Sequence, residues 1–514
     1  MRPSKGDSLL VAVGAGVSGA SGFAFAWILA RATGPSGSAV VLTVTTWFTL
    51  LLTVGKLGLD TTLVREGGRI RVGGPGAGPT SLLRWTLLPV TAGVALAGMA
   101  VAAAAQPIGQ WILSESPVPM TSLVVTGGLL LPLGVYTVIQ LAYSRGLGSI
   151  REYVAIEQVV KPGLRLLGSG LLLIAGVSGA LAFGWVWFLP VIVAATLTVW
   201  VAARRHPSHP EPRPSGPPPC ASGECSRVWR YAGPRAASQI VDIVNTSFGT
   251  MVLGVLATAA DTGAFAIALR VVFAGQLVFQ AVRLLLAPSF AALLARGRIH
   301  DAQQVFSAGT SLIVALAWPG FLLCLILPDL VLGFFGAGFE SAAPVLQVLS
   351  LAGLLLAVVG NQGSVVLMSG RSGSALAAIA AGLTVNVAVT MALLNVWGAT
   401  AAAAGWTASV LVEGLWLARA LSAEGLHPLP ETAFLMAVRV TAVVAIPLLI
   451  ARFVWPSAPW IAAAVVLVGV VAAPAVIVPA ARRQFHILTE EDQTLPDEDQ
   501  TLPEGATHDS PNPV

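Results

Sequence analysis

The feature that most constrains this chain is a succession of long apolar segments that carry almost no charge. A helix needs about 20 apolar residues to cross roughly 30 Å of hydrocarbon. Only 10% of the residues are charged, against roughly a quarter in soluble domains. The sequence therefore predicts an all-α polytopic membrane protein with about fourteen transmembrane helices. We expect the spans at residues 8–30, 38–59, 82–105, 120–144, 152–176, 180–203, 233–257, 262–289, 304–327, 342–368, 373–395, 399–421, 431–453 and 458–480.

The positive charges between these spans predict how the chain is oriented. Loops and termini on the side of the N-terminus hold twenty Lys and Arg residues, whereas the opposite side holds only Arg31 and Arg452. Cytoplasmic loops of membrane proteins carry such an excess. Both termini are therefore expected in the cytoplasm. No convincing signal-peptide cleavage site follows residues 8–30, which predicts that they remain as the first helix.

Short motifs recur at a constant spacing and predict two related halves. Ala32-Thr33 recurs as Ala257-Thr258, 225 residues later, and Gly148-Ser149 has a copy at the same distance. Each half then holds six helices, and because six is even, both copies enter the membrane in the same direction. We expect two six-helix lobes related by a pseudo-twofold axis along the membrane normal, as in transporters with parallel repeats.

Composition predicts the boundaries of these lobes. Residues 206–227 hold seven prolines and are expected to form a semi-extended cytoplasmic linker. The first lobe then covers residues 1–205, the second lobe residues 228–425, and two additional helices lie in 426–481. The acidic tail, 482–514, repeats Asp-Gln-Thr-Leu-Pro and is predicted to be a disordered cytoplasmic segment.

The sequence predicts neither an enzyme nor a cofactor. No hydrolase, kinase or dinucleotide-binding motif lies in a credible context. Cys220 and Cys225 are four residues apart in a predicted cytoplasmic loop and lack the further ligands of a metal site, so no metal is expected. The net charge of +4 comes from loop cations beside the membrane, so no nucleic-acid partner is expected either.

Four short segments carry a resemblance to a known family. They are Leu-Ala-Arg-Ala-Thr-Gly-Pro-Ser-Gly-Ser at 29–38, Gly-Leu-Asp-Thr-Thr-Leu-Val-Arg at 58–65, Thr-Gly-Ala-Phe-Ala-Ile-Ala-Leu-Arg at 262–270 and Ala-Pro-Ser-Phe at 287–290. Over about residues 8–480 the chain resembles the polysaccharide-exporter (Wzx-type) flippases of the multidrug/oligosaccharidyl-lipid/polysaccharide (MOP) superfamily. The resemblance implies a transporter of the bacterial cytoplasmic membrane that functions as a monomer, with polysaccharide-assembly proteins as partners.

Charged side chains inside the spans are the candidates for function, because a charge at mid-bilayer is costly unless it is paired or faces water. Glu157, Lys161 and Arg165 follow one another at every fourth position and share one helix face. One interpretation makes this stripe a cationic wall of a central cavity, in which Glu157 holds Lys161 in place. The other makes it an interfacial helix start, with Lys161 reaching toward the cytoplasm.

Three further cations lie in other spans. Arg270 lies about eight residues into its helix, too deep to reach the interface easily, and is expected to face the cavity. Lys56 and Arg283 lie near the cytoplasmic mouth, where each either binds an anionic headgroup or anchors its helix. We take Arg270, Lys161, Arg165, Lys56 and Arg283 as the candidate substrate-binding residues.

Three carboxylates are the candidates for binding a coupling ion. Asp242 lies near the middle of its span, where a carboxylate can hold a proton or a Na⁺ ion. The alternative is an ion pair with Arg270 of the next helix, and the two roles are compatible. Glu413 and Glu157 are further candidates of the same kind.

The excess of cations among these candidates favours an anionic cargo. A polyprenyl-diphosphate-linked oligosaccharide fits, because its diphosphate would bind the cations while its tail stays among the membrane lipids. The first hypothesis is a flippase that moves such a precursor by alternating access for cell-surface polysaccharide biosynthesis. The alternatives are a peptidoglycan lipid-precursor flippase, although the first helix holds no cation, a cation-coupled multidrug exporter, and a non-transporting membrane scaffold.

Overall fold

All regular structure in the described part of the chain is helical. The computed structural model describes residues 5–71, 79–204, 224–369 and 371–454. In chain order the elements, of which η1 and η3 are π-helical and η2 is a 3₁₀ turn, are α1 (Lys5–Gly55), α2 (Leu59–Arg71), α3 (Pro79–Ala103), α4 (Ala105–Trp111), α5 (Pro117–Gly146), α6 (Ile150–Tyr153), η1 (Val154–Val160), α7 (Lys161–Ile174), α8 (Ala180–Arg204), α9 (Glu224–Leu256), α10 (Ala259–Ala295), α11 (Ile299–Ile326), α12 (Pro328–Gly333), η2 (Glu340–Ala342), α13 (Ala343–Val359), α14 (Gln362–Met368), α15 (Ser372–Trp397), α16 (Ala399–Ser422), α17 (Glu431–Val440), η3 (Thr441–Ala445) and α18 (Ile446–Val454).

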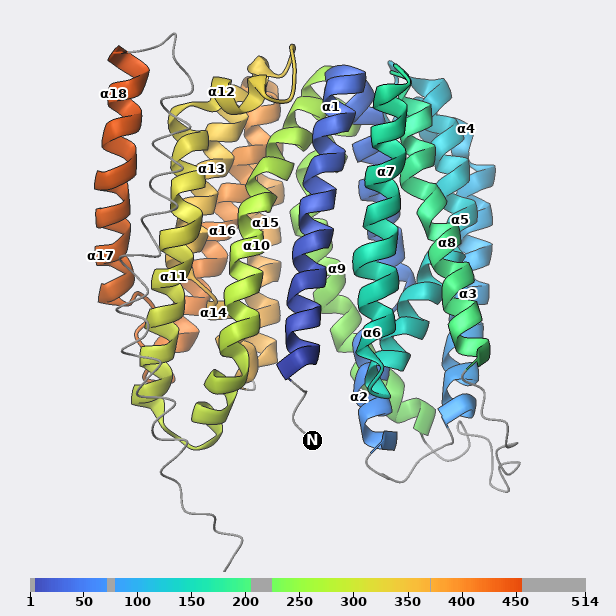
Figure 1. Cartoon of the computed structure of the whole chain (residues 1–514), viewed down its shortest axis with the longest axis horizontal. Helices are drawn as coiled ribbons and strands as arrows, with labels where there is room; N and C mark the ends of the chain where they lie inside the picture. The colour runs from blue at the N-terminus through green and yellow to red at the C-terminus, as the bar shows by residue number, and fades with distance from the viewer. Residues whose placement is uncertain (1–4, 72–78, 205–223, 370, 455–514) are drawn as a thin grey trace, which may run out of the picture.

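Helix α1 contains the first two predicted spans. A straight helix of 51 residues would be about 76 Å long, more than twice the hydrocarbon thickness. Gly34, which precedes Pro35, interrupts the helix with a φ of 65°, a conformation that glycine adopts far more readily than other residues. Figure 1 shows the segment before this break crossing from the N-terminus to the opposite face, and the segment after it returning toward α2.

The described chain holds eleven helices that are long and apolar enough to cross a membrane. The difference from the predicted number has three sources. Helix α1 counts once although it contains two spans, and the predicted span at 152–176 is divided among α6, η1 and α7, each too short to span alone. The last predicted span, 458–480, lies outside the described residues. The predicted class, an all-α polytopic membrane fold, is confirmed.

The π-helical turn η1 interrupts the fifth predicted span over seven residues. Such turns are rare, and they recur at functional sites because they change the direction in which the following side chains point. Glu157 lies in the middle of η1, and Lys161 begins α7 directly after it. This irregular segment therefore carries one of the charged residues that the sequence singles out and directly precedes another.

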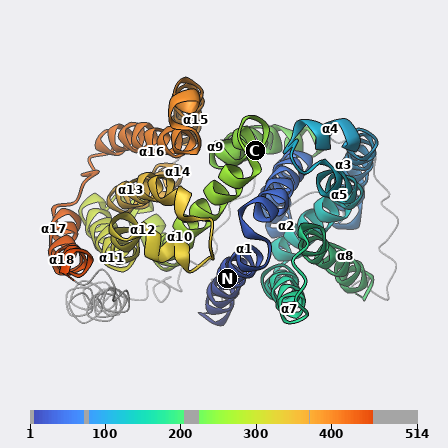
Figure 2. The same cartoon turned by 90° about the horizontal axis from the view of Figure 1, so that it is seen from above.

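The helices gather into two groups that lie side by side (Figure 2). Helices α1 to α8 form the first group and α9 to α16 the second, with α17 and α18 at the outer edge of the second group against α11. The first group contains a buried apolar cluster that includes Phe48, Leu123 and Phe188. The larger apolar cluster of the second group includes Phe265, Phe321 and Leu346, and the first segment of α1 packs into it through Leu29. Helix α1 therefore contacts both groups.

The junction between the groups falls close to the predicted linker. Residues 206–223 of that linker and the predicted tail, 482–514, lie outside the described residues. Helix α9 begins at Glu224, so the last four residues of the predicted linker lie in this helix. The reason is local: no proline occurs between Glu224 and Pro234, and the backbone forms a helix as soon as the proline-rich stretch ends.

The repeated motifs lie at helix junctions. Ala32-Thr33 precedes the break at Gly34, and Ala257-Thr258 joins α9 to α10. Gly148-Ser149 joins α5 to α6, and its copy, Gly373-Ser374, lies in the first turn of α15. Motifs that correspond in the sequence therefore occupy corresponding positions, where one span ends and the next begins.

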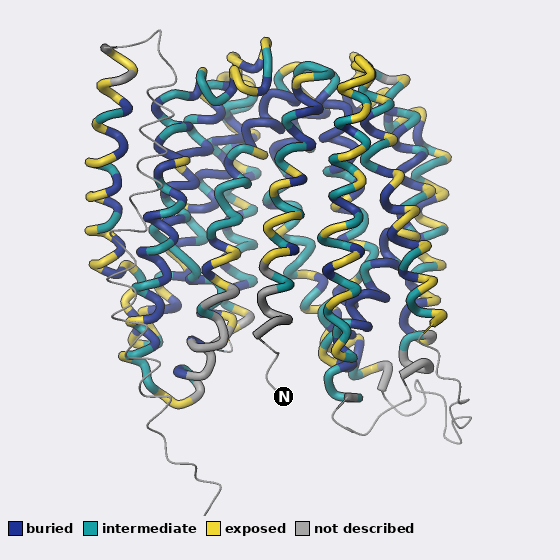
Figure 3. The backbone as a smooth tube through the Cα atoms, in the orientation of Figure 1, coloured by how far each residue is buried: buried dark blue, intermediate teal, exposed yellow. Residues whose placement is uncertain are grey.

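The outer faces of the peripheral helices are apolar and exposed. Figure 3 shows exposed residues along the outward sides of the bundle and buried residues at its centre. Large apolar side chains on these faces include Leu96 of α3, Leu171 of α7 and Val199 of α8. Apolar side chains exposed over whole helix lengths are the surface that a lipid bilayer covers.

At the face opposite the N-terminus the two groups come into close contact. Helix α10 crosses α1 at Gly263, where a Cβ atom would overlap with the Pro35 carbonyl oxygen. Beside this crossing the Ala259 N–H donates a hydrogen bond of 3.0 Å to the Glu115 carboxylate. Any side chain larger than hydrogen at position 263 would force the backbones of α1 and α10 apart.

Candidate functional site

A pocket rich in hydroxyl groups lies between the two helix groups. Its empty space, including the part open to solvent, is about 570 Å³, and its walls come from α1, α9 and α10. The residues that line it are Leu42, Thr46, Thr49, Ile243, Thr246, Ser247, Thr250, Ala266, Leu269, Arg270 and Phe273. The hydroxyls of Thr46 and Thr49 donate to carbonyl oxygens of their own helix, which leaves their oxygen lone pairs free to accept hydrogen bonds from a ligand.

Among the described residues that line this pocket, Arg270 is the only charged one. Its side chain is exposed, and within the described ranges no hydrogen bond or ion pair involves it. A cation at membrane depth is stable only if it faces water, an anion or another polar group. The pocket therefore combines an unpaired arginine with five hydroxyl groups from two helices, which suits a ligand that carries both negative charge and hydroxyl groups.

Arg165 lies close enough to Arg270 for the two charges to interact. Its Nε donates a hydrogen bond of 3.1 Å to the Trp187 carbonyl oxygen, and its guanidinium lies 4.0 Å from the centre of the Trp187 ring. Trp187 in turn packs edge-on against Phe48 and Phe188. The aromatic cluster holds Arg165 near the interface between the two helix groups. The aromatic rings do not neutralise the positive charge of its guanidinium.

Glu157 and Lys161 form an ion pair, as their spacing predicts. Lys161 Nζ lies 2.6 Å from Glu157 Oε1, and the lysine is only 9% exposed. The second carboxylate oxygen, Oε2, is buried without a partner among the described residues. The ion pair neutralises Lys161, so Arg165 contributes the free positive charge of the predicted stripe.

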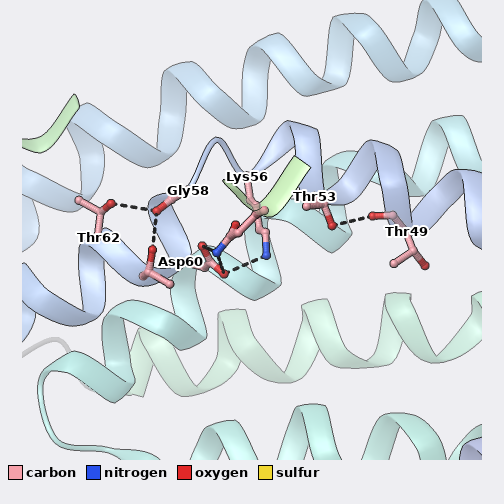
Figure 4. Close-up of polar contacts among 8 residues, drawn as sticks. Thr49, Thr53, Lys56, Gly58, Asp60 and Thr62 are labelled. Carbon is pink, nitrogen blue, oxygen red and sulfur yellow. Dashed lines mark hydrogen bonds and ion pairs between the residues drawn. The ribbon is translucent and has the colours of Figure 1, made fainter. Parts of the chain in front are cut away.

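Lys56 is also paired. Its Nζ lies 2.9 Å from Asp60 Oδ2 (Figure 4). Gln239 of α9 donates to Asp60 Oδ1 over 3.2 Å. Next to this contact, a Cβ atom on Gly58 would lie only 2.6 Å from the Ala232 carbonyl oxygen of α9. The site connects the two helix groups at the face of the N-terminus. The sequence did not single out Asp60 or Gln239 as site residues, because the contact between them joins positions 179 residues apart.

Asp242, Arg283 and Glu413, considered separately in the sequence, lie together with Arg235. Asp242 interacts electrostatically with Arg235 and Arg283, and Glu413 interacts with Asp242. The predicted alternative of an Asp242–Arg270 ion pair is wrong for the described chain, since no such pair forms. The reason is that the two residues line different pockets: Arg270 faces the hydroxyl-rich pocket, whereas Asp242 faces a second cavity near the N-terminal face.

A buried amide network, which the sequence did not predict, joins α9, α15 and α16. Asn386 Nδ2 donates to Asn245 Oδ1 (2.9 Å) and to the Asn245 carbonyl oxygen (3.0 Å). Asn245 Nδ2 donates to Ser409 Oγ over 2.9 Å, and Thr390 Oγ1 donates to Asn386 Oδ1. All four residues are at most 5% exposed. The network contains no ionisable group, so it connects the three helices by hydrogen bonds alone.

Replacing Asn386 by Ala should lower the free energy of unfolding by about 2 kcal/mol, because buried acceptors on Asn245 lose their donor. The matched control is Asn395→Ala, which removes the same side chain from an exposed position on the same helix. The measurement is the thermal denaturation midpoint of the purified protein in detergent. Equal midpoints for the two variants would contradict a stabilising role for the network.

The described part of the chain holds no candidate metal centre. Within 5–71, 79–204, 224–369 and 371–454, no cluster of three or more His, Cys, Asp or Glu side chains could bind a metal ion. Cys220, which precedes Cys225 of α9 in the sequence, lies outside the described residues, so the expectation that the two cysteines bind no metal stays a prediction.

The arrangement of the described helices is similar in fold to three solved membrane transporters. A solved lipid II flippase, MurJ in an inward closed conformation, matches with a TM-score of 0.69 at 10% identity, over 92% of this chain and 99% of MurJ. An inward-facing multidrug resistance MATE family transporter of the MOP superfamily matches with a TM-score of 0.61 at 12% identity, over 79% of this chain and 94% of the other. A MOP superfamily transporter from Pyrococcus furiosus matches with a TM-score of 0.55 at 13% identity, over 81% and 95% of the two chains. No protein-family model and no curated protein sequence matches this chain.

Proposed function

We propose that this protein is a flippase that moves a polyprenyl-diphosphate-linked oligosaccharide across the cytoplasmic membrane by alternating access. The observation that carries the proposal is the unpaired Arg270 in a hydroxyl-lined pocket between the two helix groups. Arg165, held by Trp187 nearby, adds a second positive charge. The diphosphate would bind these arginines while sugar hydroxyls bind the Thr and Ser side chains.

The proposed direction of movement is from the cytoplasmic leaflet to the outer leaflet of a bacterial cytoplasmic membrane. The excess of Lys and Arg on the N-terminal side supports this orientation. Asp242 and Glu413, which interact in the second helix group, are the proposed binding residues for the coupling ion, H⁺ or Na⁺. Glu157, which is paired with Lys161, is the weaker candidate for this role.

The peptidoglycan precursor is the second candidate cargo, and the similarity to MurJ favours it. That precursor also carries a diphosphate between a polyprenyl tail and sugars, so it presents the same charge to Arg270. The two cargoes differ in their sugars and peptide. They would therefore be distinguished by the hydroxyl-lined part of the pocket, which does not select by charge.

We expect reconstituted protein to move a fluorescent polyprenyl-diphosphate oligosaccharide across the bilayer of proteoliposomes, because both its charge and its hydroxyl groups have partners in the pocket. The assay compares this lipid with lipid II and with a cationic dye, and measures the fraction of each that becomes accessible to a membrane-impermeant quencher. Protein-free liposomes are the control.

Each result separates the proposed functions. Movement of lipid II alone would replace the oligosaccharide carrier with the peptidoglycan precursor. Transport of the dye without either lipid would indicate a multidrug exporter. Lack of all three activities in folded protein would overturn the transporter proposal in favour of a membrane scaffold.

A further inference from the structure

A second polar cavity, separate from the hydroxyl-rich pocket, lies near the face of the N-terminus. Side chains of α9, α10, α14 and α15 and the junction between α13 and α14 enclose it. Its lining consists of Arg235, Ser238, Gln239, Asp242, Arg283, Gly360, Asn361, Gly363, Ser364, Leu367 and Ile379. Arg283 and Arg270 both belong to α10, and the rise of a helix separates them by about 20 Å. One ligand headgroup cannot reach both.

Two arginines of this cavity have no fixed partner in the described chain. Neither Arg235 nor Arg283 forms a hydrogen bond or an ion pair there, although both interact with the charge of Asp242. The charge of Asp242 also acts on Glu413. The guanidinium groups are therefore available to an anion, and Asp242 is the group that competes for them.

A buried oxygen atom at the same cavity also lacks a partner. The amide nitrogen of Gln239 donates to Asp60, but its Oε1 is buried and accepts no hydrogen bond in the described structure. A buried acceptor without a donor is destabilising, and a hydroxyl-bearing ligand or a water molecule would relieve this. The cavity thus offers two guanidinium donors for charge-assisted hydrogen bonds, beside a buried amide oxygen that is left unsatisfied.

An apolar pocket adjoins this cavity. Arg283, Asn361 and Ser364 line both. Beyond these shared residues the second pocket is lined by residues of α10, α11 and α14, which are Leu286, Phe290, Val305, Phe306, Gly309, Thr310 and Val365. The two pockets together present cations at one end and hydrocarbon at the other. This is the complement of a lipid that carries a phosphate headgroup.

We propose that the Arg235–Arg283 cavity and the adjoining apolar pocket form a loading site for the phosphate or diphosphate headgroup of a lipid, with the first part of the lipid chain in the apolar pocket. The inference rests on the proposed function in one respect: the cargo would bind first at this site and then at Arg270. In the empty site the Asp242 carboxylate attracts the guanidinium groups of both arginines. A bound headgroup would replace the carboxylate in these interactions.

The test is equilibrium binding of farnesyl diphosphate, inorganic diphosphate and farnesol to the full-length protein in detergent. Farnesyl diphosphate should bind most tightly, since it alone supplies both the charge and the hydrocarbon. Arg283→Ala and Arg235→Ala should each weaken it by about tenfold or more. Asp242→Asn should tighten it, because the competing carboxylate is gone. Arg439→Ala, which removes an exposed arginine on α17, is the matched control.

The Arg270→Ala variant separates this inference from the proposed function. Binding of farnesyl diphosphate that persists in Arg270→Ala and is lost in Arg283→Ala supports a separate loading site. Binding that depends on Arg270 alone would overturn the loading site and leave the flippase proposal intact. Equal binding of farnesol would show that the arginines do not recognise the headgroup. Weaker binding in Asp242→Asn would make the cluster a structural ion network and overturn the inference.

Discussion

Arg270→Ala should lower transport of the proposed lipid-linked cargo at least tenfold while leaving the protein folded. Arg270 is the single charge in the described wall of the hydroxyl-rich pocket and has no partner there, so its removal costs no ion pair. A charge-assisted hydrogen bond to a diphosphate contributes about 1.5–3 kcal/mol, which predicts at least a tenfold loss of transport rate. The measurement is lipid movement in proteoliposomes.

Two variants make this result specific. Arg270→Lys keeps the charge but loses the planar, bidentate guanidinium, and we expect it to retain part of the activity. Arg439→Ala removes an arginine from the exposed side of α17 and should transport normally. Unchanged transport in Arg270→Ala, at equal protein content, would show that the cargo binds elsewhere.

Gly263→Ala should have the second large effect, through the arrangement of the helix groups. The added methyl group would overlap with the Pro35 carbonyl oxygen, and because this is backbone, a change of side-chain rotamer cannot relieve the overlap. We expect the face opposite the N-terminus to open and the transport rate to fall by about tenfold or more, since alternating access requires both faces to close in turn.

Maleimide labelling of Ser38→Cys in a cysteine-free background measures this opening, because Ser38 is fully buried beside the crossing. Labelling should increase in Gly263→Ala. The control is Gly16→Ala, a glycine of α1 with no atom within 4 Å of the added Cβ. If labelling and transport were the same in both variants, the close contact of α1 and α10 would play no part in closing the pocket.

The geometry at both faces suggests how the helix groups are held. At the face of the N-terminus, Asp60 accepts bonds from Lys56 of α1 and Gln239 of α9, and Gly58 lies against α9. At the opposite face, Gly263 and Pro35 are in contact. Close backbone contacts at glycines can separate without breaking ion pairs, whereas separation of the helix groups at Asp60 would break its hydrogen bond with Gln239.

The membrane spans follow from the sequence because they depend on local composition. A run of about 20 apolar residues has no stable alternative to a helix in lipid, since every backbone polar group must be bonded within the segment. The break at Gly34 and the Glu157–Lys161 pair are also local features, because the residues that define each of them are close together in the sequence. Hydropathy could not reveal that η1 divides the fifth span, because a π-helical turn changes no residue type.

The site itself depended on tertiary structure. Spacing placed Arg165 on the face of Glu157, but the packing of α7 against α8 directs it to Trp187. Asp242 joined Arg283 and Arg235 instead of Arg270, and Asn245 found Asn386, 141 residues away. The sequence alone determined which segments are apolar enough to span a membrane and which charged residues lie within them. Only the rotation of each helix about its axis, set by the side chains packed between helices, decided which polar groups meet and which, like Arg270, remain unpaired.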